Sequence, residues 1–106
     1  MVTNYNSAKV SKPAYGVTRR ILAHSDNLML TEHQLERGAI LPDHQHTHEQ
    51  LVYLLKGEIT LEMGGEKVNM ITGDSLVIPS NVSHKVIALT KSTALDIFSP
   101  ARQDYL

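Results

Sequence analysis

Three histidines in one short segment are the residues whose type and spacing point most directly to chemistry. His44, His46 and His48 all lie between Pro42 and Gln50. Neutral imidazole is the commonest metal ligand in proteins, and residues two apart on a strand point to the same side with Cα atoms about 6.6 Å apart. Two such rings can bind one ion, so this segment predicts a metal centre.

The spacing within this segment also restricts which residues can share an ion. A regular strand would place His44 and Gln50 about 20 Å apart, whereas metal–nitrogen bonds are only about 2.1 Å long. The backbone must therefore bend between His46 and Gln50 if both ends of the segment are to reach the same ion. Such a bend takes His48 out of phase, so we expect His48 beside the ligands or at the surface.

Two linked motifs give this histidine segment a family context. The run Gly38-x5-His44-x-His46-x3-Gln50-x6-Gly57 resembles the first motif of the cupin family, and Gly73-x5-Pro79-x-Asn81-x2-His84 resembles the second. The resemblance implies an all-β cupin fold, which is a double-stranded β-helix or jelly-roll barrel. Asn81 stands where the second motif has Gly but tolerates a positive φ, and Ala88 replaces its final Asn.

The cupin resemblance also implies one bound divalent metal ion and the residues that hold it, which are His44, His46, Gln50 and His84. These ligand types suit zinc, nickel, manganese and iron alike. Gln50 replaces the usual Glu, and its neutral amide leaves the ion's charge uncompensated, which favours Lewis-acid chemistry. Two alternatives stay open: the histidines are ordinary strand-end residues, as we interpret His24 and His33, or the barrel has lost its metal and only binds small molecules.

The C-terminal strand carries a second candidate group. Asp96 and Phe98 share one face of a strand, and an inward-facing Asp is costly unless it is paired or takes part in chemistry. The ending Asp-x-Phe-Ser-Pro-x-Arg-x-Asp-Tyr-Leu resembles small cupins of pectin and alginate catabolism that linearise 4,5-unsaturated monouronates. The resemblance implies that Asp96, Phe98 and Arg102 line the pocket. Val52 departs from that subgroup, which has a further pocket glutamine there.

The subgroup resemblance implies a metal-dependent lyase- or isomerase-type enzyme acting on a sugar acid, as a homodimer. Asp96 would be the general acid/base, Arg102 would bind the substrate carboxylate through its donor fork, and Phe98 would form an apolar wall. The alternatives are a non-catalytic small-molecule-binding or sensory cupin and a metal-dependent dioxygenase. Gln50 argues against the dioxygenase, because a carboxylate better stabilises ferric iron. The tail can also be a plain barrel-closing strand, with Asp96 bonded to backbone donors and Arg102 solvated.

The scaffold that positions these side chains is predicted to be all-β, because alternating and β-branched residues dominate. The Gly64-Gly65 pair predicts a two-residue hairpin turn. Residues 1–16 are predicted to form an extended arm, loose or paired with another subunit, and residues 17–106 one barrel domain. The predicted strands are Val17–Ala23, Leu28–Leu35, Gln50–Leu55, Glu58–Met63, Glu66–Ile71, Ser75–Ile78, His84–Leu89 and Thr93–Phe98.

Composition narrows the function classes further. A chain of 106 residues with 42% hydrophobic content is expected to form one domain. The formal charge of -1 without a basic stripe argues against nucleic-acid or membrane partners. The absence of cysteine excludes thiolate ligands and disulfides. No signal-peptide pattern is present near the N-terminus, so we expect a cytoplasmic protein.

Overall fold

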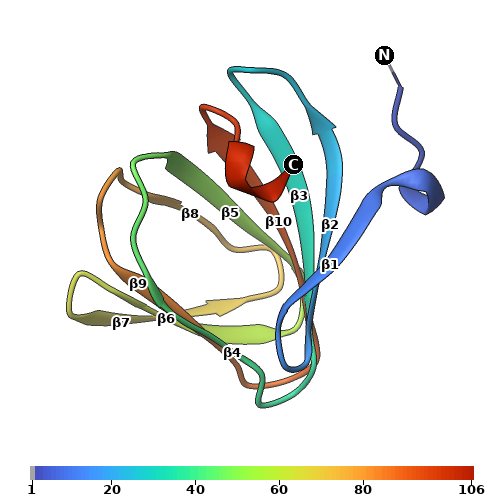
Figure 1. The fold of residues 1–106 in the computed structure, drawn as a ribbon. Helices are drawn as coiled ribbons and strands as arrows, with labels where there is room; N and C mark the ends of the chain where they lie inside the picture. Colours follow the sequence, from blue (N-terminus) through green and yellow to red (C-terminus); the bar gives the residue numbers. More distant parts are fainter. Residues whose placement is uncertain (1) are drawn as a thin grey trace.

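The structure is a computed structural model that describes residues 2–106, and it confirms the predicted all-β fold. Two antiparallel sheets face each other around a shared interior (Figure 1), with strand orders β1-β2-β3-β10-β5-β8 and β4-β9-β6-β7. The strands are β1 Lys9–Ala14, β2 Val17–His24, β3 Met29–Leu35, β4 Ile40–His44, β5 Glu49–Lys56, β6 Glu58–Met63, β7 Glu66–Ile71, β8 Ser75–Ile78, β9 His84–Ala88 and β10 Ser92–Ser99. Two short 3-10 turns complete the elements, η1 Tyr5–Ser7 and η2 Gln103–Tyr105. Within residues 2–106, no helix is long and apolar enough to cross a membrane.

All eight predicted strands are present, with bounds that differ by at most one residue, but the sequence prediction missed two further strands, β1 and β4. Each contains a proline, Pro13 in β1 and Pro42 in β4. Proline lacks a backbone donor and is confined to edge strands and bulges. Both strands do lie at the edge of their sheet, and each pairs with its neighbour through a register shift.

The expected N-terminal arm is part of the first sheet. Residues 9–14 form β1 and pair antiparallel with β2 of the same chain. Tyr5 adds a side-chain contact, because its hydroxyl donates to Glu32 on β3 at 2.7 Å. The N-terminal segment is therefore anchored within its own chain.

The core lies between the two sheets and follows the period-2 alternation of the strands. In β10 the residues Ser92, Ala94, Asp96 and Phe98 are buried, while Ile97 is exposed. Asp96 and Phe98 therefore share the inner face of β10. The main buried cluster consists of Val17, Leu35, Ala39, Val52, Leu54, Ile59, Leu61, Met70, Ile78, Ala88 and Ala94.

The predicted hairpin turn joins β6 to β7. Gly64 and Gly65 both have positive φ, 57° and 84°, which is the conformation of the tight turn that favours the twist of a hairpin. Met63 and Glu66 pair directly across it. At the opposite end of the chain, the red C-terminal segment folds back over the open end of the barrel beside β3 and β10 (Figure 1).

Candidate metal centre and its cavity

Three imidazoles converge at the mouth of the barrel. His44 is the last residue of β4 and pairs with His84, the first residue of β9. The two ring centroids lie 4.0 Å apart, and the His46 centroid lies 5.0 Å from that of His84. Ligand atoms of the three residues all lie within 4.8 Å of one another, an arrangement that can hold a metal ion.

The predicted backbone bend between His46 and Gln50 is present. Strand β4 ends at His44, the chain bends at Thr47 and His48, and β5 begins at Glu49. The Asn81 amide donates to the His46 carbonyl at 2.8 Å, which ties the bend to the loop before β9. Asn81 has a φ of 63°, so this loop uses the left-handed conformation that Asn tolerates. His48 does not belong to the three-histidine group, as its spacing indicated.

Backbone carbonyls orient all three rings in the same way. Nδ1 of His44 bonds to the Pro42 carbonyl, Nδ1 of His46 to the His48 carbonyl and Nδ1 of His84 to the Val82 carbonyl, each at 2.9 Å. A carbonyl oxygen only accepts, so each Nδ1 carries the proton and each neutral ring presents its Nε2 lone pair. Metal-bound histidines are commonly oriented through such outer partners.

Burial favours the neutral form of two of these imidazoles, His46 and His84. The pKa of His84 is lowered to about 4, chiefly because burial disfavours its charged form. Burial also lowers the pKa of His46, and the positive charge of Arg102 lowers it further. Neutral imidazole is the form that binds a metal.

Gln50 presents an oxygen to this group. Its amide nitrogen donates to Asp96 Oδ1 at 2.9 Å, which turns its Oε1 toward His46 Nε2 at 3.1 Å. Both atoms carry lone pairs when the His46 proton is on Nδ1, so a cation between them relieves their repulsion. Nε2 of His84 is also buried, and it has no hydrogen-bond partner in the part of the chain that the structure describes. These donors therefore fit a divalent metal ion.

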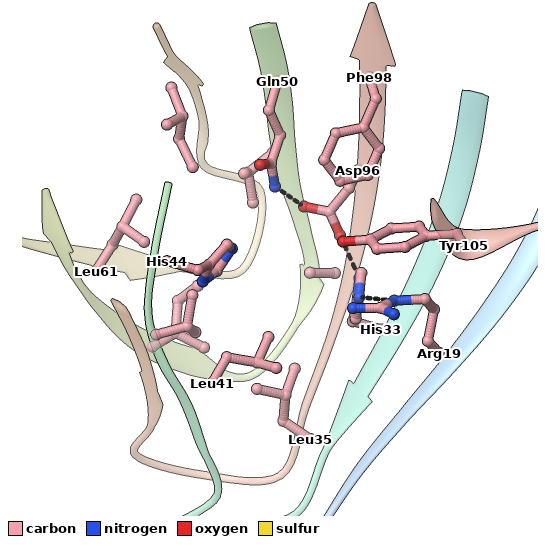
Figure 2. A pocket seen from close by; sticks show the side chains of 15 residues that line it. Arg19, His33, Leu35, Leu41, His44, Gln50, Leu61, Asp96, Phe98 and Tyr105 are labelled. Atoms are coloured by element: carbon pink, nitrogen blue, oxygen red, sulfur yellow. Dashed lines mark hydrogen bonds and ion pairs between the residues drawn. The ribbon is translucent and has the colours of Figure 1, made fainter. Parts of the chain in front are cut away.

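Asp96 lines a cavity between the sheets together with His44 and Gln50 (Figure 2). Its carboxylate is buried and accepts two hydrogen bonds, one from Gln50 and one from His33 Nδ1 at 2.7 Å. Phe98 also lines this cavity, with its ring centroid 5.8 Å from that of His46. The lining residues are Arg19, His33, Leu35, Leu41, His44, Gln50, Val52, Ile59, Leu61, Ile78, Val86, Ala94, Asp96, Phe98 and Tyr105.

The sequence reasoning did not identify three polar residues that line the cavity, which are His33, Arg19 and Tyr105. His33 was interpreted there as an ordinary residue, yet it is 5% exposed and bonded to Asp96. Arg19 Nε donates to His33 Nε2 at 3.0 Å, and the Arg19 guanidinium carbon lies 3.6 Å from the centroid of the Tyr105 ring. Alternation with Leu35 along the predicted strand could have placed His33 on the inner face.

Arg102 stands beside the cavity with one side of its guanidinium bonded to Asp104. Its Nε and Nη2 donate to the two carboxylate oxygens of Asp104 at 3.0 and 2.8 Å. The guanidinium carbon lies 5.3 Å from the Phe98 ring centroid. Nη1 is buried without a partner among residues 2–106. Asp104 therefore occupies the fork formed by Nε and Nη2, while the two N–H groups of Nη1 stay without a partner among the described residues.

Comparison with known proteins decides the family. The profile of the cupin domain matches residues 31–98, which include all of the converging histidines. The chain belongs to the cupin family. This cupin is similar to the pectin degradation protein KdgF of Dickeya dadantii, with 37% identity over 93 residues that cover 86% of this chain and 84% of the relative.

Solved structures show the similarity to other cupins over the whole chain. KdgF from a Halomonas species superposes with a TM-score of 0.92 at 33% identity, over 100% of this chain and 98% of the other. An RmlC-like cupin from Shewanella frigidimarina also reaches 0.92, at 28% identity over 99% and 95% of the two chains. Both chains match almost end to end, so this similarity extends beyond the profile to the N-terminal strand and the C-terminal turn.

Proposed function

We propose that this cupin is a metal-dependent enzyme that opens the ring of 4,5-unsaturated monouronates. The observation that carries the proposal is the link from Asp96 through Gln50 to His46. Through this link the buried carboxylate of Asp96 is bonded to the amide nitrogen of Gln50, and the amide oxygen of Gln50 faces His46. The similarity to KdgF, named for pectin degradation, supports an unsaturated sugar acid as the substrate.

The proposed ligand set is His44, His46, Gln50 and His84. A bound divalent ion supplies Lewis-acid stabilisation of charge that develops on a substrate oxygen. Gln50 contributes a neutral oxygen, and its amide nitrogen orients Asp96 at the same time. One side chain therefore couples the ligand set to the proton-transfer group.

In the proposed reaction, Asp96 moves the proton. Ring opening takes the proton from the anomeric hydroxyl, forms the C1 carbonyl and breaks the bond between C1 and the ring oxygen. The resulting enolate gains a proton at C4 and becomes the linear keto acid, so the overall change is an isomerisation. Asp96 accepts the first proton as general base and returns one as general acid.

The remaining pocket residues bind and orient the substrate. Phe98 forms an apolar wall against the sugar ring, and Nη1 of Arg102 donates to the substrate carboxylate. A charge-assisted hydrogen bond of this kind is about twice as strong as a neutral one. Asp104 holds the other side of Arg102, so the guanidinium is already oriented before substrate arrives.

The test measures the disappearance of the enol-ether absorbance of unsaturated galacturonate with metal-loaded protein. Acceleration over the spontaneous reaction is expected, with a loss of about 100-fold or more in Asp96→Asn. Glu66→Gln, which removes an exposed acid on β7, is the matched control and keeps full activity. No acceleration, or full activity in Asp96→Asn, overturns the proposal. Tight uronate binding without turnover would point instead to the non-catalytic binding cupin.

We also propose that the protein is a homodimer that buries the outer face of the six-stranded sheet. One apolar row crosses this face, because Leu30 pairs with Ile97, Ile97 with Leu51 and Leu51 with Val77. Ile97, Leu51 and Val77 are 39%, 46% and 46% exposed. A contiguous apolar patch of this kind is typical of protein–protein contact sites.

A further inference from the structure

A chain of hydrogen bonds leads from Asp96 away from the metal ligands and across the sheet. Figure 2 shows it running from Gln50 through Asp96 and His33 to Arg19. These residues come from β5, β10, β3 and β2, which are consecutive neighbours in the sheet. Arg19 and His33 are direct cross-strand partners, so strand register brings their side chains together.

The donors in this chain fix the protonation of His33. The Nε–H of Arg19 can only donate, so His33 Nε2 must accept with a lone pair. The ring proton is then on Nδ1, from which it is donated to Asp96 Oδ2 at 2.7 Å. His33 is therefore neutral and in a single tautomer.

Asp96 consequently receives one donor on each oxygen. Gln50 donates to Oδ1 and His33 to Oδ2, and both donors are nearly fully buried. Two fixed donors set the plane of the carboxylate, while each oxygen keeps a second lone pair for the cavity. Because His33 is neutral, Asp96 is held by hydrogen bonds and not neutralised by an imidazolium.

Arg19 is itself held in place by packing. Its guanidinium stacks on Tyr105 of η2 with 3.6 Å between Cζ and the ring centroid. Arg102 lies against the same ring, 4.3 Å from its centroid. Such stacking of a planar guanidinium on an aromatic ring restricts its orientation. The C-terminal turn thus keeps the Arg19 donor aimed at His33.

We infer that Arg19 and His33 are positioning residues for Asp96. Arg19 fixes the tautomer of His33, and His33 holds the carboxylate in the orientation that proton transfer needs. The catalytic part of this inference rests on the proposed function, whereas the tautomer is a property of the folded chain. The two parts therefore need separate measurements.

Nitrogen NMR of protein with isotope-labelled histidine, kept metal-free, tests the tautomer. The His33 signals are assigned by their absence in His33→Asn. The expected wild-type pattern is a protonated Nδ1 and an unprotonated, hydrogen-bonded Nε2. In Arg19→Met the Nε2 lone pair loses its donor, and its resonance is expected to move away from the hydrogen-bonded position toward that of a free, unprotonated nitrogen. A wild-type proton on Nε2, or an unchanged resonance in Arg19→Met, overturns the inference.

Arg20→Met is the matched control for that substitution. Arg20 is the next residue on β2, but its side chain packs on Tyr5 and donates to the Tyr5 carbonyl. The same change of side chain there removes a stacked guanidinium from the opposite face of the strand. The His33 resonances are expected to stay in place, and a shift as large as that in Arg19→Met would contradict a specific role for Arg19.

Kinetics with unsaturated galacturonate tests the positioning role. His33→Leu removes the donor to Asp96 and is expected to lower kcat about 10–100-fold, as loss of an orienting partner typically does, with KM little changed. His33→Asn places an amide donor near the position of Nδ1 and is expected to recover much of kcat. Equal losses in both variants, or no loss in His33→Leu, overturn the role. An inactive wild type contradicts the proposed function alone, because the NMR result still decides the tautomer.

Discussion

His46 Nε2 and Gln50 Oε1 face each other at 3.1 Å with a lone pair on each atom. His46 has its proton on Nδ1, bonded to a backbone carbonyl. Gln50 has its amide hydrogens turned toward Asp96. Neither residue can rotate away without losing a hydrogen bond, and for the buried bond of Gln50 this costs about 1–3 kcal/mol. The pair is therefore organised to receive a cation.

The first prediction concerns metal content. Purified wild-type protein is expected to hold one equivalent of divalent metal by elemental analysis, and His84→Ala close to none. His84 contributes a buried Nε2 that no polar partner satisfies among the described residues. His24→Ala removes an exposed histidine at the end of β2 and is expected to keep the full equivalent. Stoichiometric metal in His84→Ala would refute the ligand set.

Metal removal is expected to lower thermal stability in the wild type alone. A ligand that binds only the folded state at a free concentration 100 times its Kd stabilises by about 2.7 kcal/mol. Thermal unfolding of wild type and His84→Ala, each with metal and with chelator, measures this. Chelator should lower the wild-type Tm and leave that of His84→Ala unchanged, and equal shifts in both proteins would argue against binding at this site.

The third prediction concerns the pH dependence of the metal-free protein. The pKa of His84 is lowered from 6.5 to about 4 by burial. Between these values the unfolded chain binds a proton at this residue and the folded chain does not, so stability falls as the pH drops from about 6.5 toward 4. Urea unfolding across this range is expected to show a weaker pH dependence in His84→Gln than in wild type. An identical pH dependence of the unfolding free energy in both proteins would show that His84 does not contribute to it.

Gly57 provides a stability prediction away from the site. Its φ is +100°, and an added Cβ would clash with the Ser92 side chain and approach the Lys91 carbonyl oxygen to 2.6 Å. Gly57→Ala is expected to cost about 2–5 kcal/mol in urea unfolding, from left-handed strain plus overpacking. Gly65→Ala, with a φ of +84° and open space around it, tests the strain alone at about 1–2 kcal/mol. Equal costs would contradict the close approach at Gly57.

The proposed dimer is tested by charging its apolar row. Ile97→Lys places an ammonium in the middle of the outer sheet face, and desolvating it on association is unfavourable. Sedimentation is expected to give a dimer for wild type and a monomer for this variant. Ile71→Lys makes the same change on β7 of the other sheet, where Ile71 is 55% exposed, and should stay dimeric. A monomeric wild type would end the proposal.

Much of the fold was predictable because the strands with clear alternation each have one buried and one exposed face. The segment Glu58–Met63 alternates Ile59, Leu61 and Met63 with polar residues, and its bounds were predicted correctly. Strand β4 was not, because Pro42 and Asp43 interrupt the apolar pattern. Its hydrogen bonds to β9 come from tertiary pairing, which local sequence does not encode.

The candidate site was likewise predictable where the local sequence restricts the backbone, and not where strand pairing brings residues together. His44 and His46 were predictable because their spacing, together with the bend required before Gln50, restricts the backbone locally. His84 was predicted only through the resemblance to the second cupin motif. The roles of Arg19 and His33 were not predictable, because neither residue belongs to a local group of candidate site residues in the sequence. Only the pairing of β2 with β3 and of β3 with β10 brings them to Asp96. The contact of Arg102 with Asp104, two residues further along the chain, was not predicted, because it depends on the fold of the C-terminal turn.

The register of β10 has a consequence for how this protein can diverge. Asp96 pairs with Val52 and Phe98 with Gln50 on the neighbouring strand. Deleting or inserting one residue in β10 before Asp96 would turn both inner side chains outward together, since strand faces alternate. This interior can therefore change by point substitution more readily than by a change of length in that part of β10.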